Sequence, residues 1–365
     1  MNIKILLPLA ASSLALAACS SESGNANAAA ETAAANASSD SEEIGSNFSG
    51  SDGYDDPETA SQPEAREKNG KLEVSLPDGV TQNMLGERTT QMIAVQVMLD
   101  RSRHSPGVID GRGGSNTDRA IRYYREAKGL KKGTQVDSEL IQALYSDIGG
   151  DIFRTYTLSE KDVAGPFRKV PADFEAMSKV DKLGYESAQE MLAERFHMDQ
   201  DFLKALNPDA DFTRAGTRLV IVSHGNRTFD SEIAKIEVRK GEATVVGLDK
   251  SGKVLVSYPA TIGSSEFPSP SGSMKVAALA MEPNYTFDPK SQNWGPDKTF
   301  ILPPGPNNPV GGTWIDLGKD GYGIHGSPDP QLVAKNASHG CVRLTNWDVA
   351  ELAKAVKTGI PVVFV

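Results

Sequence analysis

The C-terminal third of the chain contains the stretch Ile324-His325-Gly326-Ser327, followed by Ser338-His339-Gly340-Cys341-Val342-Arg343-Leu344. This stretch places two histidines and one cysteine within 17 residues. A thiol is mostly protonated at neutral pH, and only the thiolate attacks a carbonyl. A neighbouring imidazole can take the proton and leave a thiolate–imidazolium pair. We therefore predict that Cys341 is the nucleophile of an enzyme.

The residues around Cys341 suit such a nucleophile. Gly340 allows a tight turn and a close approach of substrate, and backbone N–H groups at such a turn can hold an oxyanion. Arg343 is placed to bind a carboxylate with two parallel hydrogen bonds. The alternative is a structural cysteine beside a surface loop. Ser223-His224-Gly225 repeats the Ser-His-Gly sequence without a cysteine, and we assign it no role.

This stretch resembles the signature of the L,D-transpeptidases of the YkuD family. That signature is a His-Gly, a gap of a dozen or so residues, and Ser/Thr-His-Gly-Cys followed by Arg or Asn. Segments 268–276 (PSPSGSMKV) and 303–311 (PPGPNNPVG) look like the same family. The resemblance covers about residues 230–365, for which it implies a mostly-β fold.

The resemblance also implies roles for single residues. Cys341 is the nucleophile, and His325 is the general base that later protonates the leaving amine. The carbonyl of Gly326 orients the His325 imidazole. His339 shapes the site or stabilises the intermediate. The oxyanion hole is implied at Gly340 and the N–H of Cys341, and the substrate-binding residues are Arg343, Gly326 and Ser338.

The implied reaction is acyl transfer on peptidoglycan stem peptides. The thiolate attacks the carbonyl that joins the L-centre of diaminopimelate to a terminal D-alanine, and an acyl-enzyme forms. The acceptor is the diaminopimelate of another stem, which gives a 3→3 cross-link, or a lysine of a wall-linked lipoprotein. Two alternatives stay open: an L,D-carboxypeptidase that uses water, and a non-catalytic tether between envelope and wall. No metal or organic cofactor is implied, because one Cys with two His is better explained by catalysis.

Residues 1–18 resemble the signal peptide of a bacterial lipoprotein. Lys4 precedes a short apolar run from Ile5 to Leu16, which is too short to span a bilayer stably. Leu16-Ala17-Ala18-Cys19 resembles a lipobox, so we expect cleavage before Cys19 and lipidation of that cysteine. The alternative is an ordinary signal peptide cut after Ala18. Ser20 is similar to the residue found after Cys in lipoproteins sent to the outer membrane, on the periplasmic side of a Gram-negative envelope.

Residues 19–65 have the composition of a flexible, acidic tether. Residues 20–65 contain ten Asp and Glu and no Lys or Arg. Removing these ten from the 48 acids of the chain leaves 38, against 38 bases, so the net charge of −10 belongs to this segment. Such a segment buries too little apolar area to fold, and as a coil it would reach roughly 40 Å. The chain has no basic patch that would indicate nucleic acid as a partner.

Two small modules are expected between the tether and the catalytic domain. In residues 84–148, helices are predicted around Val95 to Leu99, from Thr117 to Lys128, and from Asp137 onward. This three-helix pattern resembles the peptidoglycan-binding-1 domain through the stretch 106–111 (PGVIDG). Residues 182–222 read as helix, helix and strand, and resemble a LysM module. Both resemblances imply peptidoglycan as a partner.

The pattern of residues 230–365 changes to the alternation of β strands. Antiparallel strands are predicted around Ile236 to Val238, at 243–248 and at 253–258, with later strands at 274–279 and 311–316. A helix capped by Asn346 follows Cys341, and residues 361–365 form a final strand buried in the sheet. Trp314 and Tyr322 pack within strands or, alternatively, line the cleft. The overall prediction is a multidomain α+β chain.

Overall fold

The computed structural model describes residues 65–224, 229, 231–263, 271–290, 295–319, 321–335 and 341–365. The predicted signal peptide and tether, with Cys19, lie outside these ranges, as do Ser338, His339 and Gly340. Within the described ranges, no helix combines the length and the apolar character needed to cross a bilayer.

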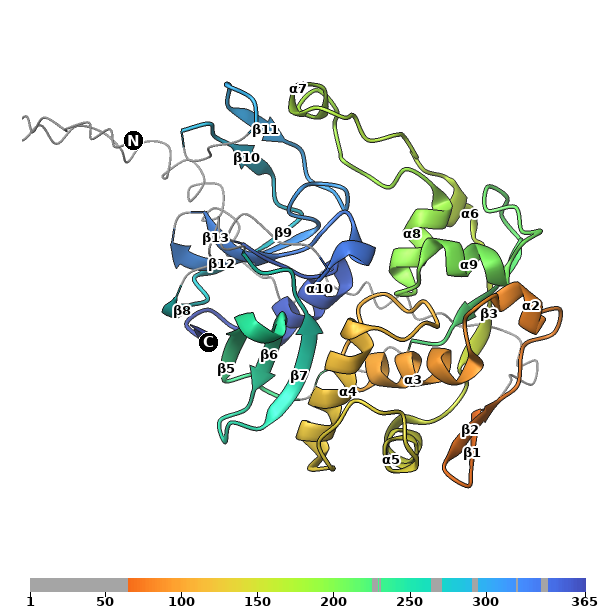
Figure 1. Ribbon diagram of the computed structural model, residues 1–365. Helices are drawn as coiled ribbons and strands as arrows, with labels where there is room; N and C mark the ends of the chain where they lie inside the picture. The colour runs from red at the N-terminus through yellow and green to blue at the C-terminus, as the bar shows by residue number, and fades with distance from the viewer. Residues whose placement is uncertain are drawn as a thin grey trace, which may run out of the picture. The chain divides into compact units, whose positions relative to one another are not determined.

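The first half of the described chain is mainly helical (Figure 1). Its helices begin and end where the sequence provides caps. Thr89, Asp137 and Asp199 each accept a hydrogen bond from a backbone N–H of the first turn. The elements are β1 (Ala65–Lys68), β2 (Lys71–Val74), α2 (Gln82–Leu85), α3 (Thr90–Arg101), α4 (Ser115–Lys128), α5 (Ser138–Ile148), β3 (Phe153–Thr157), α6 (Glu160–Val163), α7 (Phe174–Met177), α8 (Ala188–Arg195), α9 (Gln200–Leu206) and β4 (Arg218–Val222).

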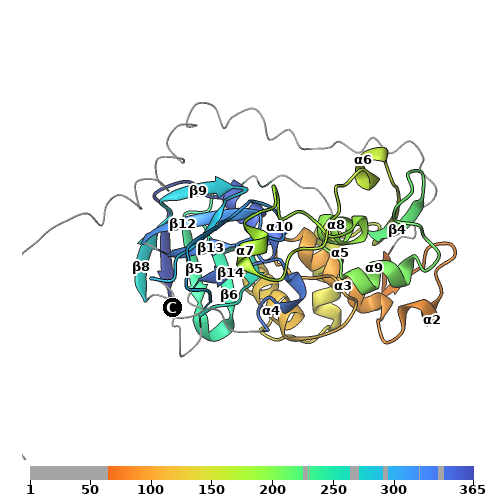
Figure 2. The same cartoon turned by 90° about the horizontal axis from the view of Figure 1, so that it is seen from above.

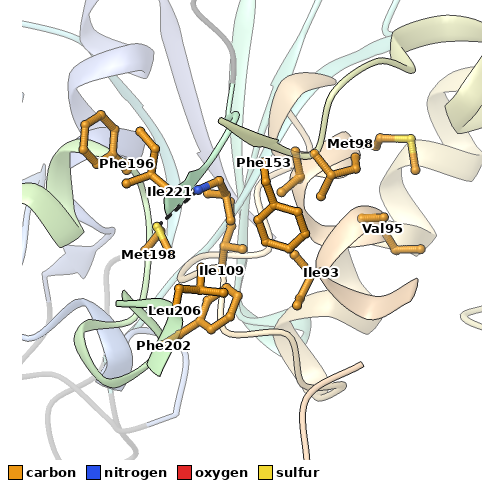
Figure 3. Close-up of a cluster of buried hydrophobic side chains, with 14 of the residues drawn as sticks. Ile93, Val95, Met98, Ile109, Phe153, Phe196, Met198, Phe202, Leu206 and Ile221 are labelled. Carbon is orange, nitrogen blue, oxygen red and sulfur yellow. Dashed lines mark hydrogen bonds between the residues drawn. The ribbon is translucent and has the colours of Figure 1, made fainter. Parts of the chain in front are cut away.

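One hydrophobic core runs through both predicted small modules. Figure 3 shows Ile93 and Met98 of α3 in the same cluster as Phe202 of α9 and Ile221 of β4. Strand β3, which lies between the two predicted modules, pairs antiparallel with β4 of the second one. Residues 65–222 therefore pack as one unit, in which the predicted boundary between the modules does not divide the core. Their resemblance to glycan-binding domains stays a prediction.

The second half is mostly strand. Its elements are β5 (Lys235–Arg239), η1 (Lys240–Glu242), β6 (Thr244–Leu248), β7 (Val254–Pro259), β8 (Gly272–Lys275), β9 (Ala278–Met281), β10 (Tyr285–Phe287), β11 (Phe300–Leu302), β12 (Thr313–Lys319), β13 (Tyr322–His325), η2 (Pro330–Leu332), β14 (Val342–Arg343), α10 (Asn346–Ala355) and β15 (Pro361–Phe364). One sheet has the order β7-β6-β5-β15-β8 and another the order β14-β13-β12-β9. Strands β10 and β11 form a separate hairpin.

Three predictions for this half need correction. The strand expected at 274–279 is two strands in different sheets, because Val276 N–H bonds to Ile360 O while Ala277 N–H bonds to Asp316 O. The sheets are mixed, since β15 is parallel to β5 and β14 is parallel to β13. The cap of α10 is Thr345, whose hydroxyl accepts from Asp348 N–H, so the Asn346 side chain is left for other contacts.

Helix α10 lies between the second sheet and the helical half. It contacts β12 and β13 on one side and α8 on the other (Figures 1 and 2). The helix begins five residues after Cys341, so the segment that carries Cys341 leads into a helix that contacts α8.

A second junction lies at His104, which follows α3. Ser105 N–H donates to the carbonyl of Ser257 in β7, and Ser257 N–H donates to the carbonyl of Arg103. The His104 side chain is buried, with Nδ1 3.0 Å from the Ser257 hydroxyl. Burial, with a smaller effect of Lys128, lowers the pKa of His104 to about 3.

We predict that His104 makes folding stability depend on pH. Its pKa rises from about 3 in the folded chain to about 6.5 on unfolding, so the unfolded chain binds more protons between these values. The stabilisation is therefore complete above about pH 6.5 and is lost as the pH falls toward 3. Lowering the pH from 7.5 to 5.0 should cost wild type about 2 kcal/mol more than His104→Gln. Urea unfolding of both proteins at the two values measures this difference, and equal losses would contradict it.

Candidate active site

The parallel pairing of β13 with β14 brings the two parts of the motif together. Ile324 lies opposite Val342, and His325 lies opposite Arg343. Side chains alternate along a strand, so residues 341 and 343 face the same side as residue 325. Cys341, which directly precedes β14, thus lies diagonally across the strand pair from His325.

The His325 imidazole is buried and fixed by its own neighbour. Its Nδ1 lies 2.7 Å from the carbonyl oxygen of Gly326, the contact expected from the sequence. A carbonyl only accepts hydrogen bonds, so Nδ1 carries the proton and Nε2 is left as the acceptor. Burial, together with the charge of Arg343, lowers the pKa of His325 to about 3, against a smaller opposing effect of Gly326. The ring is therefore neutral at physiological pH.

Trp314 holds the other side of this ring. It lies opposite His325 in the antiparallel β12–β13 pair, and the two rings stack at 5.4 Å with 16° between their planes. Trp314 thus packs within its strand pair, as the sequence indicated, and also contacts the His325 ring. Its indole occupies the space that a side chain at Gly323 would need. The glycine inside strand β13 is a sequence signal for this close approach.

The Cys341 thiol contacts the backbone of the strand that carries His325. Its Sγ donates to the carbonyl of Gly321 at 3.1 Å. Burial raises the pKa of the thiol, and the backbone of Gly323 and the charge of Arg343 offset this in part. Burial thus opposes the charged form of both Cys341 and His325. The resting pair is a thiol and a neutral imidazole, in contrast to the ion pair considered from sequence.

Arg343 is held by its backbone, and its side chain acts on both groups. Its backbone exchanges two hydrogen bonds of 2.9 Å with Thr261. Within the described residues, its Nε is buried and has no hydrogen-bond partner. The positive charge lowers the pKa of Cys341 and that of His325. An unpaired buried N–H beside the thiol is suited to a carboxylate ligand.

Tyr285 of β10 is a neighbour of the site that the sequence did not indicate. Burial raises the pKa of its phenol, the thiol of Cys341 adds to this, and Arg343 opposes it. Phe174 of α7 packs against the same hairpin, 6.4 Å from the Tyr285 ring and 5.0 Å from that of Phe287. Segment 150–180, which carried no sequence signal, thus supports the hairpin beside the thiol.

One group of possible metal ligands occurs in the part of the chain that the structure describes, at Asp100, His197 and His224. Nδ1 of His197 lies 3.1 Å from each carboxylate oxygen of Asp100. The ring stacks on Trp347 at 5.0 Å and lies 4.4 Å from the His224 ring. Burial has the largest single effect and lowers the pKa of His197, but Asp100, Asp348 and Glu351 together outweigh it, so the net pKa is raised. Because the Asp100 carboxylate already lies within hydrogen-bond distance of the His197 ring, we interpret this group as a hydrogen-bonded pair with stacked rings.

Comparison with known proteins identifies the family of this region. Residues 234–364 match the family model YkuD, described as the L,D-transpeptidase catalytic domain. The chain is 27% identical to YkuD of Bacillus licheniformis over 170 residues, which cover 47% of this chain and 88% of that protein. It is 32% identical to YqjB of Bacillus subtilis over 129 residues, 34% of this chain and 65% of that protein. Both relatives are themselves named only provisionally as L,D-transpeptidases.

A crystal structure of a mutant of the Enterococcus faecium L,D-transpeptidase is 24% identical, covers 40% of this chain and 55% of that chain, and has a TM-score of 0.29. From the family match, residues 234–364 are an L,D-transpeptidase catalytic domain of the YkuD type. Residues before 234 lie outside this match.

We predict that the resting Cys341 thiol reacts slowly at neutral pH. Because burial raises its pKa above the usual 9.0, the rate of alkylation by iodoacetamide should rise about tenfold per pH unit from 7 to 9. The rate is measured by mass spectrometry of the intact protein, with Cys341→Ser as the unlabelled control. A rate that is already constant between pH 6 and 8 would reveal a preformed thiolate instead.

Proposed function

We propose that this protein is a cysteine-dependent L,D-transpeptidase that acts on peptidoglycan stem peptides. One observation carries the proposal. Within the YkuD-type domain, a neutral imidazole whose Nε2 is an acceptor lies on the strand paired with that of Cys341 and Arg343. This is the arrangement that a thiol nucleophile and its general base require.

In the first half of the reaction, Nε2 of His325 takes the thiol proton as Sγ attacks the diaminopimelate–D-alanine carbonyl. A tetrahedral intermediate forms, with its oxyanion held by the N–H groups of Cys341 and Gly340. The C–N bond then breaks, and the imidazolium returns the proton to the D-alanine amine. D-alanine leaves, and a thioester remains on Cys341.

The second half reverses these roles. The acceptor amine attacks the thioester, His325 removes its proton, and the thiolate leaves and takes that proton back. Neutral resting groups suit this cycle, because the base must accept a proton in each half. Diaminopimelate as the acceptor gives a 3→3 cross-link, and a lipoprotein lysine gives attachment to the wall.

Arg343 is proposed to recognise a substrate carboxylate. The terminal D-alanine carries a carboxylate next to the scissile bond, and diaminopimelate carries a second one at the far end of its side chain. Among the described residues the buried Nε of Arg343 has no hydrogen-bond partner, which supports this role, and the planar guanidinium binds a carboxylate through two hydrogen bonds.

We further propose that the protein is an exported lipoprotein anchored through Cys19, on the periplasmic face of the outer membrane. The lipobox-like sequence 16–19 and the acidic segment that follows it support this proposal. The helical half would then assist in binding peptidoglycan while the tether spans the distance to the wall.

The proposed activity is tested with disaccharide-tetrapeptides and the soluble portion from about residue 64. We expect cross-linked dimers that lack one D-alanine, and no such product from Cys341→Ala or His325→Gln. Arg343→Gln should raise KM about tenfold or more, because a charged hydrogen bond to the carboxylate is lost. Mass spectrometry of the muropeptides measures all of these products.

Other products would contradict the transpeptidase assignment. Tripeptide monomers with free D-alanine, and no dimers with any amine acceptor, would indicate an L,D-carboxypeptidase. A complete lack of Cys341-dependent product, with wall binding retained, would indicate the non-catalytic tether.

The anchor is tested by labelling cells with an alkyne-tagged palmitate. We expect the full-length protein to take up the label and to fractionate with the outer membrane, and Cys19→Ser to do neither. Cys341→Ser is the matched control and should be labelled like wild type. Equal labelling of the Cys19→Ser protein would refute lipidation at this residue.

A further inference from the structure

Glu194 of helix α8 is a buried carboxyl group that touches the catalytic domain. Only 7% of the residue is exposed. Both of its oxygens accept from the Asn346 amide, at 3.0 Å and 3.3 Å from Nδ2. Burial raises the pKa of Glu194 to about 8, while the hydrogen bond from Asn346 opposes the shift. Burying a carboxyl group costs free energy, and an apolar side chain could dock the helix without that cost. The presence of Glu194 here therefore indicates a role beyond docking.

Asn346 carries this contact to the backbone beside His325. As the first residue of α10, it is free of the capping role that Thr345 fills. Its Oδ1 accepts from Gly312 N–H at 3.3 Å and lies directly against Gly326 and Gly311. A side-chain carbon on either glycine would collide with this oxygen, so the three residues are in close contact.

Gly326 is in turn the residue that orients the imidazole. Its carbonyl oxygen accepts from Nδ1 of His325 at 2.7 Å. A shift of the Gly326 peptide would turn the ring and move Nε2 away from the thiol. The side chains of Glu194 and Asn346 thus form a continuous series of contacts from α8 to the base.

We propose that Glu194 is a positioning residue for the reaction, which fixes His325 through Asn346 and the Gly326 peptide. The inference rests on the proposed function of His325 as general base. It assigns the helical half a part in the chemical step, in addition to any part in wall binding. Displacements near 1 Å from a productive geometry can lower rates on the order of a hundredfold, so such support matters for turnover.

Glu190 offers a matched control on the same helix. Its Oε1 accepts from Asn307 Nδ2 at 2.7 Å, so it also joins α8 to the catalytic domain. Asn307 Nδ2 also donates to Gly184 O, whereas Asn346 Nδ2 donates to Glu194 and to Pro306 O. Replacing Glu190 therefore removes a docking contact of similar kind and leaves the series to His325 intact.

The test compares Glu194→Leu, Glu194→Gln and Glu190→Leu in the full chain. The measurements are kcat and KM with tetrapeptide, and the rate of Cys341 acylation by p-nitrophenyl acetate. We expect Glu194→Leu to lower kcat and the acylation rate about tenfold or more, with KM within about twofold. Glu194→Gln keeps an oxygen acceptor for Asn346 and should stay within about threefold of wild type. Glu190→Leu should leave both rates nearly unchanged.

A second pair of variants tests the same contact without an apolar substitution. Asn346→Asp removes the amide donor and places a second carboxyl group against Glu194, and it should slow acylation about as much as Glu194→Leu. Adding Glu194→Gln restores a donor–acceptor pair and should recover most of the rate, a coupling that independent sites do not show.

Two results would overturn the inference. One is a Glu194→Leu protein that acylates like wild type while His325→Gln does not. The other is an equal loss in Glu194→Leu and Glu190→Leu, which would assign the effect to docking alone. Ester acylation needs no stem peptide, so it separates this inference from the proposed substrate. If the wild-type protein is acylated at Cys341 with the help of His325 but is inactive on tetrapeptides, only the proposed substrate is refuted.

Discussion

The parallel pairing of β13 with β14 is the constraint on which the site depends. It sets Ile324 opposite Val342 and His325 opposite Arg343, across 17 intervening residues. A slip of one residue would turn Cys341 and Arg343 to the opposite face of the sheet from His325. The register is held from both sides, since β12 pairs with β13 and Thr261 pairs with Arg343. The site is therefore a property of the sheet more than of its loops.

Burial gives this site its electrostatic character. The same desolvation that raises the pKa of Cys341 lowers that of His325, so both groups rest uncharged. A preformed thiolate–imidazolium pair would need no proton transfer before attack, but burying its two charges would cost free energy. Arg343 favours the thiolate and disfavours the imidazolium, so its charge alone cannot stabilise the pair as a unit. In the proposed reaction, the negative charge that develops on the bound carbonyl is therefore assigned to backbone N–H groups.

The sequence predicted those features that local patterns encode. Helices α4, α5 and α9 lie where the caps and apolar spacing indicated, as do the early strands of the catalytic half. The His-Gly and Cys-containing motifs predicted a nucleophile and a base, and those roles stay part of the proposed function. The sequence did not decide whether Trp314 packs within a strand or lines the site, because its position depends on the strand register that sets it opposite His325. Tyr285 and Glu194 were missed, since each reaches the site only through long-range packing. Asn346 was predicted to cap α10, and this was wrong because its neighbour Thr345 is the cap.

The helical half is joined to the catalytic half through buried polar groups. Burying such groups costs free energy, and a spacer would not need them. His104 is kept neutral against Ser257, and Glu194 is kept buried against Asn346. Simple attachment to a wall polymer would need only a flexible linker between the halves, with exposed ends. A buried polar contact is instead specific in geometry, because each donor must meet its acceptor or lose stability. The contacts from Glu194 through Asn346 to the Gly326 peptide are those whose fixed geometry would matter for catalysis, because the Gly326 carbonyl orients His325. We therefore regard α8 as part of the framework that holds the base, in a chain where the family match itself begins only at residue 234.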